Sequence, residues 1–172
     1  MVGRIADGLG RLRDALAIED TPEGLRIVVT RRIDAPPERV WELLVDTRRW
    51  PDWGPSVLDV ETRSPRIEAG ASGRVRTFFG RWLPFTVTRV SEWSWAWRIG
   101  PVQATGHRVV PQGDVCRAGF EVPLFAFPYV LVCWWALARI EVLATASSAD
   151  NRPGRSDATD RSTDQADGPK GR

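Results

Sequence analysis

The chain has few of the residues that carry catalytic or metal-binding chemistry. Its 172 residues include one histidine and two cysteines, and only Lys170 among the 24 basic residues is a lysine. Cys116 and Cys133 form no C-x-x-C pair or other metal-ligand spacing, so we expect small buried thiols. A His-rich metal site is excluded by the single histidine, and a zinc site is disfavoured. We therefore expect neither a metal nor a cofactor.

Familiar active-site motifs are absent as well. The sequence has no glycine-rich phosphate loop, no Gly-x-Ser-x-Gly elbow and no H-E-x-x-H pair. A formal net charge of +2 is too small to indicate a nucleic-acid partner. The N-terminus has no apolar run long enough for a signal peptide, and together with the isolated cysteines this favours a cytoplasmic location.

Tryptophan is the residue present in excess. There are nine tryptophans in a chain that is 42% hydrophobic and 27% charged, which is otherwise an ordinary globular composition. Each indole brings a large apolar area and one N–H group that needs a partner. Nine of them indicate a deep core or an aromatic-lined cavity, within one domain that carries tails.

The longest apolar stretch carries no charge between Glu121 and Arg139. A bilayer, a partner surface or the protein's own sheet is able to bury it. Pro123 and Pro128 argue against a membrane span, because a proline inside a helix costs about 3 kcal/mol. We predict instead a strand, a short break, and a core helix from Pro128 to about Ala146. That helix is apolar nearly all round and is expected to be buried on most sides.

The two ends of the chain differ from its middle. Residues 2–18 place Ile5, Leu9, Leu12 and Leu16 at helical spacing, which predicts a short amphipathic helix within an N-terminal extension, 1–24. This helix either packs on the domain or lies on a membrane surface. Residues 147–172 lack Val, Ile, Leu, Phe, Trp and Tyr, so a disordered polar tail is expected.

The middle of the chain, 25–146, alternates strands with turns and contains two small helices. One strand comes first, the helices follow, and six strands after them indicate an antiparallel meander. Strands are predicted at 25–33, 57–62, 74–79, 82–90, 93–99, 105–110 and 115–122, and helices at 38–45 and within 46–55.

Specific residues accompany this order of elements. They are Ile33-Asp-Ala-Pro-Pro-Glu-Arg-Val-Trp41, then Asp46 and Arg49-Trp-Pro-Asp-Trp53, and finally Gly106-His-Arg-Val-Val-Pro111. With them the chain resembles the SRPBCC (START-like) superfamily, which includes polyketide cyclase/dehydrase-like and lipid-transfer proteins. The resemblance implies an α+β helix-grip fold: a curved seven-stranded antiparallel sheet around a long C-terminal helix, with two short helices between strands 1 and 2. It also implies a cavity for an apolar ligand between sheet and helix.

The segment Trp93-Ser-Trp-Ala-Trp97 is the sharpest local pattern. Strand alternation puts its three indoles on one face, where they either line a ligand site or pack as core. The candidate lining residues are Trp53, Phe85, Trp93, Trp95, Trp97 and His107, with Trp134 and Trp135 contributed by the helix.

Catalytic candidates are few. His107 is the only side chain with an ordinary pKa near neutrality, so it either moves a proton or serves as a structural histidine. Arg31 and Arg89 share the apolar parity of their strands and are candidates to steady a ligand oxyanion, unless their positions near strand ends turn them outward. Glu121 has the polar parity and is predicted to lie on a solvated face.

The leading hypothesis is therefore a protein that binds a small hydrophobic or aromatic ligand, lipid-like or polyketide-like. The first alternative is an enzyme resembling polyketide cyclases and aromatases, using His107 and an inward arginine. The second is a peripheral membrane or partner-binding role, because a sheet covers only one side of the apolar helix. A membrane surface, a second subunit in a homodimer or the N-terminal helix is the candidate cover for the other side.

Overall fold

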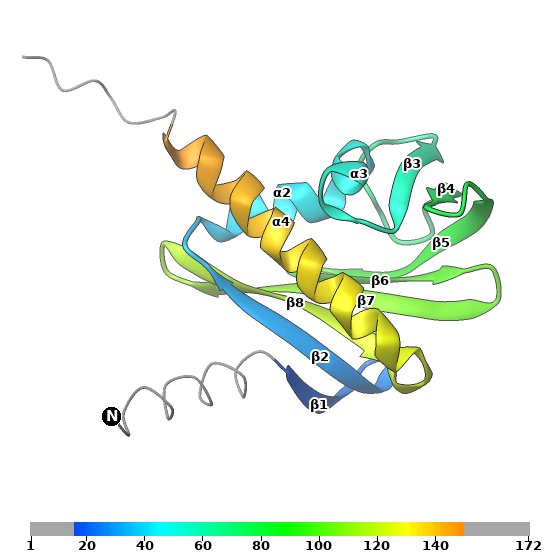
Figure 1. Cartoon of the computed structure of the whole chain (residues 1–172), viewed down its shortest axis with the longest axis horizontal. Coiled ribbons are helices and arrows are strands. Elements are labelled where there is room, and N and C mark those ends of the chain that lie inside the picture. Colours follow the sequence, from blue (N-terminus) through cyan, green and yellow to red (C-terminus); the bar gives the residue numbers. More distant parts are fainter. Residues whose placement is uncertain (1–15, 150–172) are drawn as a thin grey trace, which may run out of the picture.

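Eight antiparallel strands form one curved sheet, and a long helix lies across one of its faces (Figure 1). The computed structural model describes residues 16–149. The predicted α+β helix-grip architecture is confirmed. The strands are β1 (Leu16–Thr21), β2 (Gly24–Ile33), β3 (Val57–Thr62), β4 (Ser72–Thr77), β5 (Trp82–Ser91), β6 (Ser94–Ile99), β7 (Val102–Gln112) and β8 (Val115–Pro123). The helices are α2 (Pro37–Val45), η1 (Thr47–Arg49), α3 (Trp50–Trp53), η2 (Leu124–Tyr129) and α4 (Val130–Ala149), where η marks a 3-10 helix.

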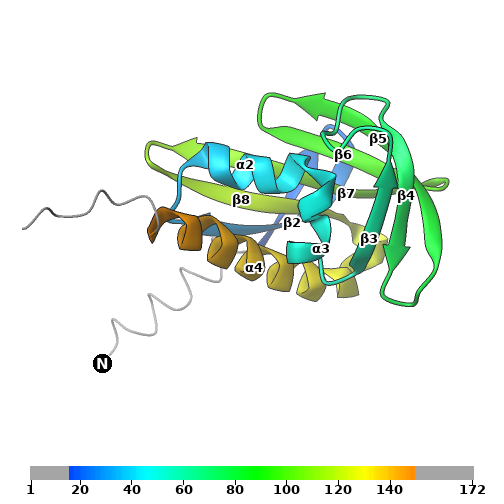
Figure 2. The same cartoon turned by 90° about the horizontal axis from the view of Figure 1, so that it is seen from above.

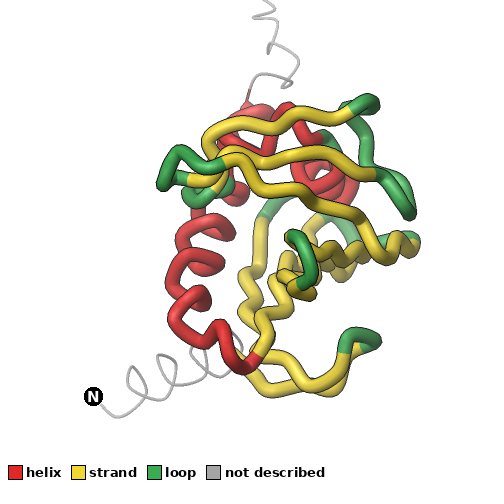
Figure 3. Tube along the Cα trace, turned by 90° about the vertical axis from the view of Figure 1, so that its right-hand side faces the viewer, coloured by secondary structure: helices red, strands yellow, loops and turns green. Residues whose placement is uncertain are grey.

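The sheet order is β1-β2-β8-β7-β6-β5-β4-β3. Strands β3 to β8 form the predicted meander, with a longer loop between β3 and β4 and short turns between the others, and β2 joins it by pairing with β8. Two of the turns use Gly80 (φ 76°) and Gly113 (φ 74°), backbone conformations that glycine adopts without steric cost. The sheet bends around the helices (Figure 3), so its concave face forms the core.

The eighth strand corrects two sequence predictions. Seven strands were expected, and residues 16–18 were assigned to a helix over residues 2–18. Instead β1 pairs with β2 from Leu16 opposite Val29 to Thr21 opposite Gly24. Gly24 has a φ of 92°, which lets the chain reverse direction between β1 and β2. The pairing with β1 covers an edge of β2 that would otherwise have no hydrogen-bonded neighbour. The rest of the expected helix lies outside the described residues.

Helix α4 begins and ends slightly later than predicted. The strand, break and helix occur in the expected order, with Pro128 inside η2 and α4 running from Val130 to Ala149. The first three residues of the segment predicted to be a disordered tail, 147–149, are therefore helical. The rest of that segment lies outside the described residues.

The two faces of α4 have different surroundings, although both are apolar. Its buried residues face the sheet, and they are Val130, Cys133, Ala136, Leu137, Ile140 and Ala144. On the opposite side four side chains are between 43% and 71% exposed, and they are Leu131, Trp134, Trp135 and Val142. The prediction that the helix is buried on most sides is wrong, because the sheet contacts one side and nothing in the described chain covers the other.

Two small helices extend the layer that α4 forms. Figure 2 shows α2 and α3 beside α4 over the same face of the sheet, and both contact α4. Pro37 is the first residue of α2, and Glu38 lies in its first turn, where the helix dipole favours a carboxylate. These helices bring Trp50 and Trp53 over the concave face, which positions the site described below.

Replacing Ile140 with alanine is expected to lower the free energy of unfolding by about 2–5 kcal/mol, because its side chain is fully buried against the sheet. Val142→Ala is the matched control two residues along the same helix. Since Val142 is 65% exposed, its loss should change stability by about 0.5 kcal/mol. Urea unfolding of both variants measures the difference, and equal effects would contradict the two-faced packing of α4.

Candidate functional site

The centre of the concave face is a cluster of aromatic rings. Trp95 on β6, His107 on β7 and Phe120 on β8 are cross-strand neighbours, so their side chains point the same way. Trp50 and Trp53 of α3 reach the same rings from above the sheet. All five side chains are buried, so this cluster is part of the core.

Three of the rings form a continuous stack. The imidazole of His107 lies 3.8 Å from the Trp95 ring at an interplanar angle of 12°. The Trp50 indole lies on the same tryptophan, 5.3 Å between centroids and 4° apart. Trp97 meets Trp50 edge to face at 5.1 Å. Parallel offset rings and perpendicular rings are the favoured arrangements of aromatic pairs, so the stack stabilises the contact between α3 and the sheet.

Most of the buried indole N–H groups have partners. Trp50 and Trp53 donate to the backbone carbonyls of Leu44 and Leu43 at 2.9 and 2.7 Å, which ties α3 to the end of α2. Trp97 donates to Thr105 Oγ1 at 3.1 Å. The Nε1 of Trp95 and the Nδ1 of His107 are buried without a hydrogen-bond partner within residues 16–149.

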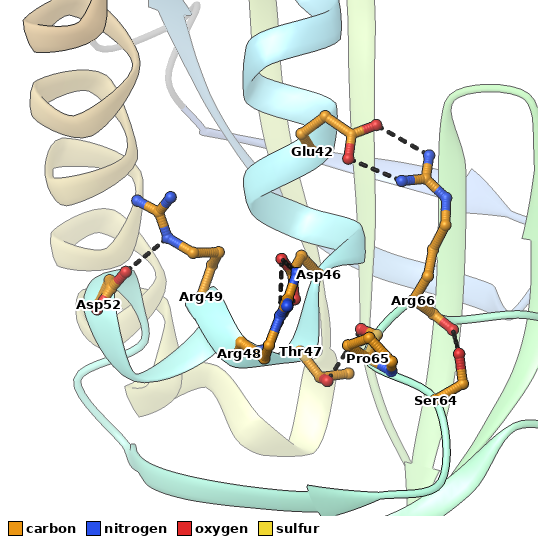
Figure 4. A network of polar contacts seen from close by, with 9 residues as sticks. All are labelled: Glu42, Asp46, Thr47, Arg48, Arg49, Asp52, Ser64, Pro65 and Arg66. Carbon is orange, nitrogen blue, oxygen red and sulfur yellow. Dashed lines mark hydrogen bonds and ion pairs between the residues drawn. The ribbon is translucent and has the colours of Figure 1, made fainter.

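A polar network holds the two small helices in place over these rings (Figure 4). Glu42 receives two hydrogen bonds from Arg66, at 2.7 and 2.9 Å, and these bonds lower the pKa of its carboxyl group. Asp46 caps η1 by accepting from the Arg48 backbone at 3.0 Å, and its hydrogen bonds with the Arg48 side chain lower its pKa. Thr47 bonds to the Pro65 carbonyl at 3.0 Å. The motif Arg49-Trp-Pro-Asp-Trp53 therefore has a structural role, which is to attach α3 to the end of α2.

The space left inside this cluster is small. A cavity of about 30 Å³ lies between α3, the sheet and α4, and its wall includes Trp53, Trp95, His107 and Cys133. A space of this size has room for about one or two water molecules and not for an apolar ligand. The tryptophans therefore fill the interior in which an apolar ligand was expected.

A much larger hollow opens at one end of the sheet, and we call it the mouth groove. Its volume is about 870 Å³, and its walls come from the β4–β5 turn, the β6–β7 turn and η2, segments far apart in the sequence. The wall is mostly apolar. Prominent lining residues are Phe78, Phe79, Leu83, Trp97, Ile99, Val102, Phe125 and Tyr129.

The mouth groove adjoins the small cavity. Ser56, Val57, Trp97, Thr105 and Tyr129 belong to the walls of both. The hydroxyl groups of Ser56 and Tyr129 are 2.5 Å apart and form a neutral polar pair at this junction. A ligand in the mouth groove would therefore touch the aromatic cluster at its inner end.

The predicted lining residues separate into three groups. Trp53, Trp95, Trp97 and His107 surround the small cavity, but among the eight candidates only Trp97 lines the mouth groove. Phe85 is buried in the core beside Trp50 and Trp97. The other three candidates do not contribute to either wall.

Those three residues correct the expected arrangement. Trp93 lies in the turn before β6, not on the strand, and packs edge to face on Trp41 of α2 at 5.8 Å. Trp134 and Trp135 are on the exposed side of α4, 43% and 62% exposed. Trp93 precedes β6, which begins at Ser94, but its contact with α2 and the core keeps it on the same helix-covered side as Trp95 and Trp97, as the alternation predicted.

The two candidate arginines are engaged elsewhere. Arg31 does point toward the helix side of the sheet, but its Nε donates to Glu141 of α4 at 2.6 Å. Arg89 is turned to the outer face, because a β-bulge between Val87 and Arg89 reverses the side-chain alternation of β5. There its guanidinium group makes two hydrogen bonds with Glu23, at 2.7 and 3.0 Å. Neither arginine is bonded to His107 in the described part of the chain.

Glu121 is buried, so the prediction of a solvated position is wrong. Its outward parity is right, since it lies opposite Gly106 on the outer face, yet it is only 4% exposed. Arg108 lies 3.8 Å away and also pairs with Glu19 of β1 at 2.8 Å. Burial raises the pKa of Glu121, and Arg108 offsets this only in part. Glu19 of β1 holds Arg108 beside Glu121, so the β1–β2 hairpin helps to bury this carboxylate. The residue pattern of β8 alone does not predict this burial.

His107 is neutral at physiological pH. Complete burial lowers its pKa to about 3, and the backbone of Trp95 opposes that shift only partly. A histidine acts best as an acid or base when its pKa lies near the working pH. With the arginines engaged elsewhere, the residues expected to act together in a cyclase-like mechanism do not converge.

The remaining titratable candidates are inert. Cys116 and Cys133 are free and buried, as predicted, and burial raises the pKa of their thiols to about 11 and about 12. Within residues 16–149 no group of three His, Cys, Asp or Glu side chains is placed to hold a metal ion.

Sequence reasoning missed most of the mouth groove. Phe78 and Phe79 were placed at the end of a strand, whereas they lie in the β4–β5 turn and are 55% and 77% exposed. Phe125 was treated as part of a buried stretch, but it is 76% exposed. The signal in the sequence was the pair of adjacent phenylalanines directly before Gly80. A glycine there indicates a turn, and aromatic side chains exposed in a turn indicate a binding surface instead of a core.

Comparisons with known proteins agree with the fold. The sequence model of a family described as "Polyketide cyclase / dehydrase and lipid transport" matches residues 24–141. No curated protein matches the chain significantly. Among solved structures, Ms6760 from Mycobacterium smegmatis is 19% identical with a TM-score of 0.53, covering 76% of this chain and 98% of its own.

Two further structures share the fold at low identity. NE0264 from Nitrosomonas europaea is 15% identical with a TM-score of 0.54, over 71% of this chain and 95% of its own. DynU16, a protein of the dynemicin biosynthetic locus, is 20% identical with a TM-score of 0.51, over 70% of this chain. The match spans 47% of DynU16, about half its length. At these identities the likeness concerns the fold alone.

The burial of His107 predicts a specific dependence of stability on pH. The unfolded side chain titrates near pH 6.5 and the folded one near 3, so the unfolded state binds more protons between these values. Stability should therefore fall as the pH decreases below about 6.5, and His107 alone should contribute a loss of about 2 kcal/mol between pH 7 and pH 5. Urea unfolding of the wild type and of His107→Gln at both pH values isolates this contribution.

A spectroscopic control avoids the variant altogether. Because the chain has one histidine, its imidazole C–H signal is unambiguous by NMR. The signal should not shift between pH 5.5 and 8. A titration midpoint near 6.5 would show that the imidazole is solvated, which contradicts the stacked arrangement.

Proposed function

Because the chain belongs to the polyketide cyclase/dehydrase and lipid transport family, we propose that it binds a small apolar molecule in the mouth groove. The observation that carries the proposal is the groove itself, about 870 Å³ of mostly apolar space that three separate segments enclose. Ligand sites in proteins are hollows of about 300–1,000 Å³ with apolar walls and a few polar groups.

The groove offers the contacts that such a ligand needs. Phe78, Phe79 and Phe125 present exposed rings on opposite walls, and Trp97 closes the inner end. Burying exposed apolar surface is favourable by about 25 cal/mol for each Å², so contact with these rings would supply most of the affinity. The Ser56–Tyr129 pair gives the ligand one neutral polar anchor.

Binding is a better account of the site than catalysis. His107 lies on the wall of the 30 Å³ cavity and not on that of the mouth groove, and burial lowers its pKa to about 3. Arg31 and Arg89 form ion pairs with Glu141 and Glu23 instead of facing the groove. Among the described residues, the mouth groove is lined by no pair of groups able to exchange a proton near neutrality, and its wall holds hydroxyl groups and aromatic rings.

Filling the groove should abolish binding. Ala126 lies on its wall in η2, and Ala126→Trp adds a large side chain there. An apolar fluorescent probe such as N-phenyl-1-naphthylamine is expected to bind the wild type with enhanced emission and to bind this variant at least about tenfold more weakly.

Ala146→Trp is the matched control, because Ala146 is exposed near the end of α4 and away from the groove. It should leave the affinity for the probe unchanged. If neither the wild type nor the control binds the probe or any of a panel of long-chain lipids and polyaromatic molecules, the proposed function is wrong.

A second candidate function is reversible binding to a lipid bilayer surface. We call the exposed residues Leu131, Trp134, Trp135 and Val142 the outer stripe of α4. They recur at helical spacing on one side, and Trp side chains favour the membrane–water interface. The segment Leu124–Ala146, with a mean hydropathy of 1.5, is long and apolar enough to cross a membrane. However, its other side packs on the sheet, which fits surface contact better than crossing.

Two observations favour a bilayer as the cover of the outer stripe. Phe125 and Phe127 in η2 are 76% and 61% exposed and directly precede the stripe, and Phe125 also lines the mouth groove. Exposed apolar side chains therefore follow one another along the chain from the groove to the stripe, which would bring a lipid of the bilayer close to the groove. Glu141, the one carboxylate of α4, is paired with Arg31.

Removing apolar area from the outer stripe should weaken bilayer binding. The variant Leu131→Gln/Trp135→Gln is expected to reduce co-sedimentation with phosphatidylcholine vesicles by more than about tenfold. Val110→Gln is the control, because Val110 is 45% exposed on β7, away from α4, and should not affect binding. Wild-type protein that stays in the supernatant at millimolar lipid contradicts the proposal. A dimer that the double variant dissociates would instead identify a second copy as the cover.

A further inference from the structure

Among residues 16–149, the wall of the mouth groove carries a single charged residue, Arg81. We propose that the ligand of the groove is an amphiphile with one anionic group, and that Arg81 binds this group while the apolar body lies among the phenylalanines. The inference rests on the proposed function, since it specifies the chemistry of the molecule that the groove holds.

Arg81 belongs to a turn whose backbone is fixed. Its carbonyl oxygen accepts from the Thr77 backbone N–H at 2.9 Å and from Thr77 Oγ1 at 3.1 Å, which closes the β4–β5 turn. The same turn carries Phe78 and Phe79. The base of the Arg81 side chain is therefore held in place beside two aromatic rings of the groove, while its guanidinium group is free to adjust.

The guanidinium group has no carboxylate partner among residues 16–149. This differs from Arg74 on the same hairpin, which forms an ion pair with Glu61 and lies over the Trp82 ring. In the part of the chain that the structure describes, no acidic residue lines the mouth groove, so none of these side chains would compete with an anionic ligand. Arginine suits carboxylate and phosphate groups because its planar fork donates two parallel hydrogen bonds.

The rest of the wall limits the ligand to one charge. Apart from Arg81 its polar side chains are neutral, and at the inner end they are Ser56, Thr105 and Tyr129. A second charge placed against them would lose hydration without gaining an opposite charge. The apolar rings of Phe78, Phe79 and Phe125 favour a hydrocarbon or aromatic body. These constraints together describe a monoanionic amphiphile, with its headgroup at the β4–β5 turn.

The test compares ligands that differ only in the headgroup. Dodecanoate, methyl dodecyl phosphate (a phosphodiester with one negative charge) and dodecanol are titrated into the full-length protein at pH 8 and low salt, and each is measured by its displacement of bound N-phenyl-1-naphthylamine. Wild-type protein is expected to prefer either anion over the alcohol by about two- to fivefold, the range of a partly solvated ion pair. A larger preference for one anion identifies whether the headgroup is a carboxylate or a phosphate.

The variant Arg81→Gln should remove that preference and leave the affinity for dodecanol unchanged. Arg76→Gln is the matched control, because Arg76 is an exposed arginine of the same hairpin that does not line the groove. It changes the net charge equally and should keep the preference. Added salt at about 0.15 M should reduce the preference in the wild type, since the ion pair is partly screened.

The outcomes separate this inference from the proposed function. If dodecanol binds and Ala126→Trp abolishes its binding, but Arg81→Gln leaves the anion preference intact, the role of Arg81 is wrong and the groove function stands. Equal loss of preference in Arg76→Gln would likewise overturn the inference, because net charge would explain it. If no probe binds at all, the proposed function fails and the inference fails with it.

Discussion

The stack of Trp50, Trp95 and His107 is the contact on which the rest of the site depends. It joins the short α3 helix to the middle of the sheet, with ring distances of 5.3 and 3.8 Å. Because these rings fill the space between sheet and helices, the interior cavity shrinks to about 30 Å³ and His107 loses its contact with water. The usable binding volume then lies at the mouth of the sheet, where the turns and η2 leave about 870 Å³ open.

A second constraint follows from the geometry of one sheet and one helix. A sheet contacts a helix along one side only, so a helix that is apolar all round keeps an uncovered face. In α4 that face begins beside the mouth groove, since η2 contributes Phe125 to the groove and leads directly into the exposed residues of the helix. The apolar groove, the exposed phenylalanines of η2 and the outer stripe thus follow one another along the chain. A protein that exchanges an apolar ligand with a bilayer would use these side chains in both steps.

Residue patterns predicted the elements well and the direction of individual side chains less well. The strand–helix junction at Ile33, the small helices around Trp50 and the final helix occur where spacing and prolines placed them. Arg89 was assigned to the wrong face because a β-bulge adds one residue to β5, and a bulge leaves no clear trace in hydrophobic alternation. Glu121 was assigned the right face but the wrong environment, because side chains from other strands cover it.

The sequence by itself determined the fold class, the aromatic character of the core and the scarcity of titratable groups, since these depend on composition and on local periodicity. Only the tertiary structure decided whether the tryptophans line a cavity or fill it, because that depends on how α3 docks on the sheet. It also decided that Phe125 joins the adjacent Phe78 and Phe79 in the wall of the mouth groove, although more than forty positions separate it from them in the chain. The tertiary structure also gave the two sides of α4 different environments. One side packs on the sheet, and the other side is not covered by any of residues 16–149, because a single sheet contacts a helix on one side only.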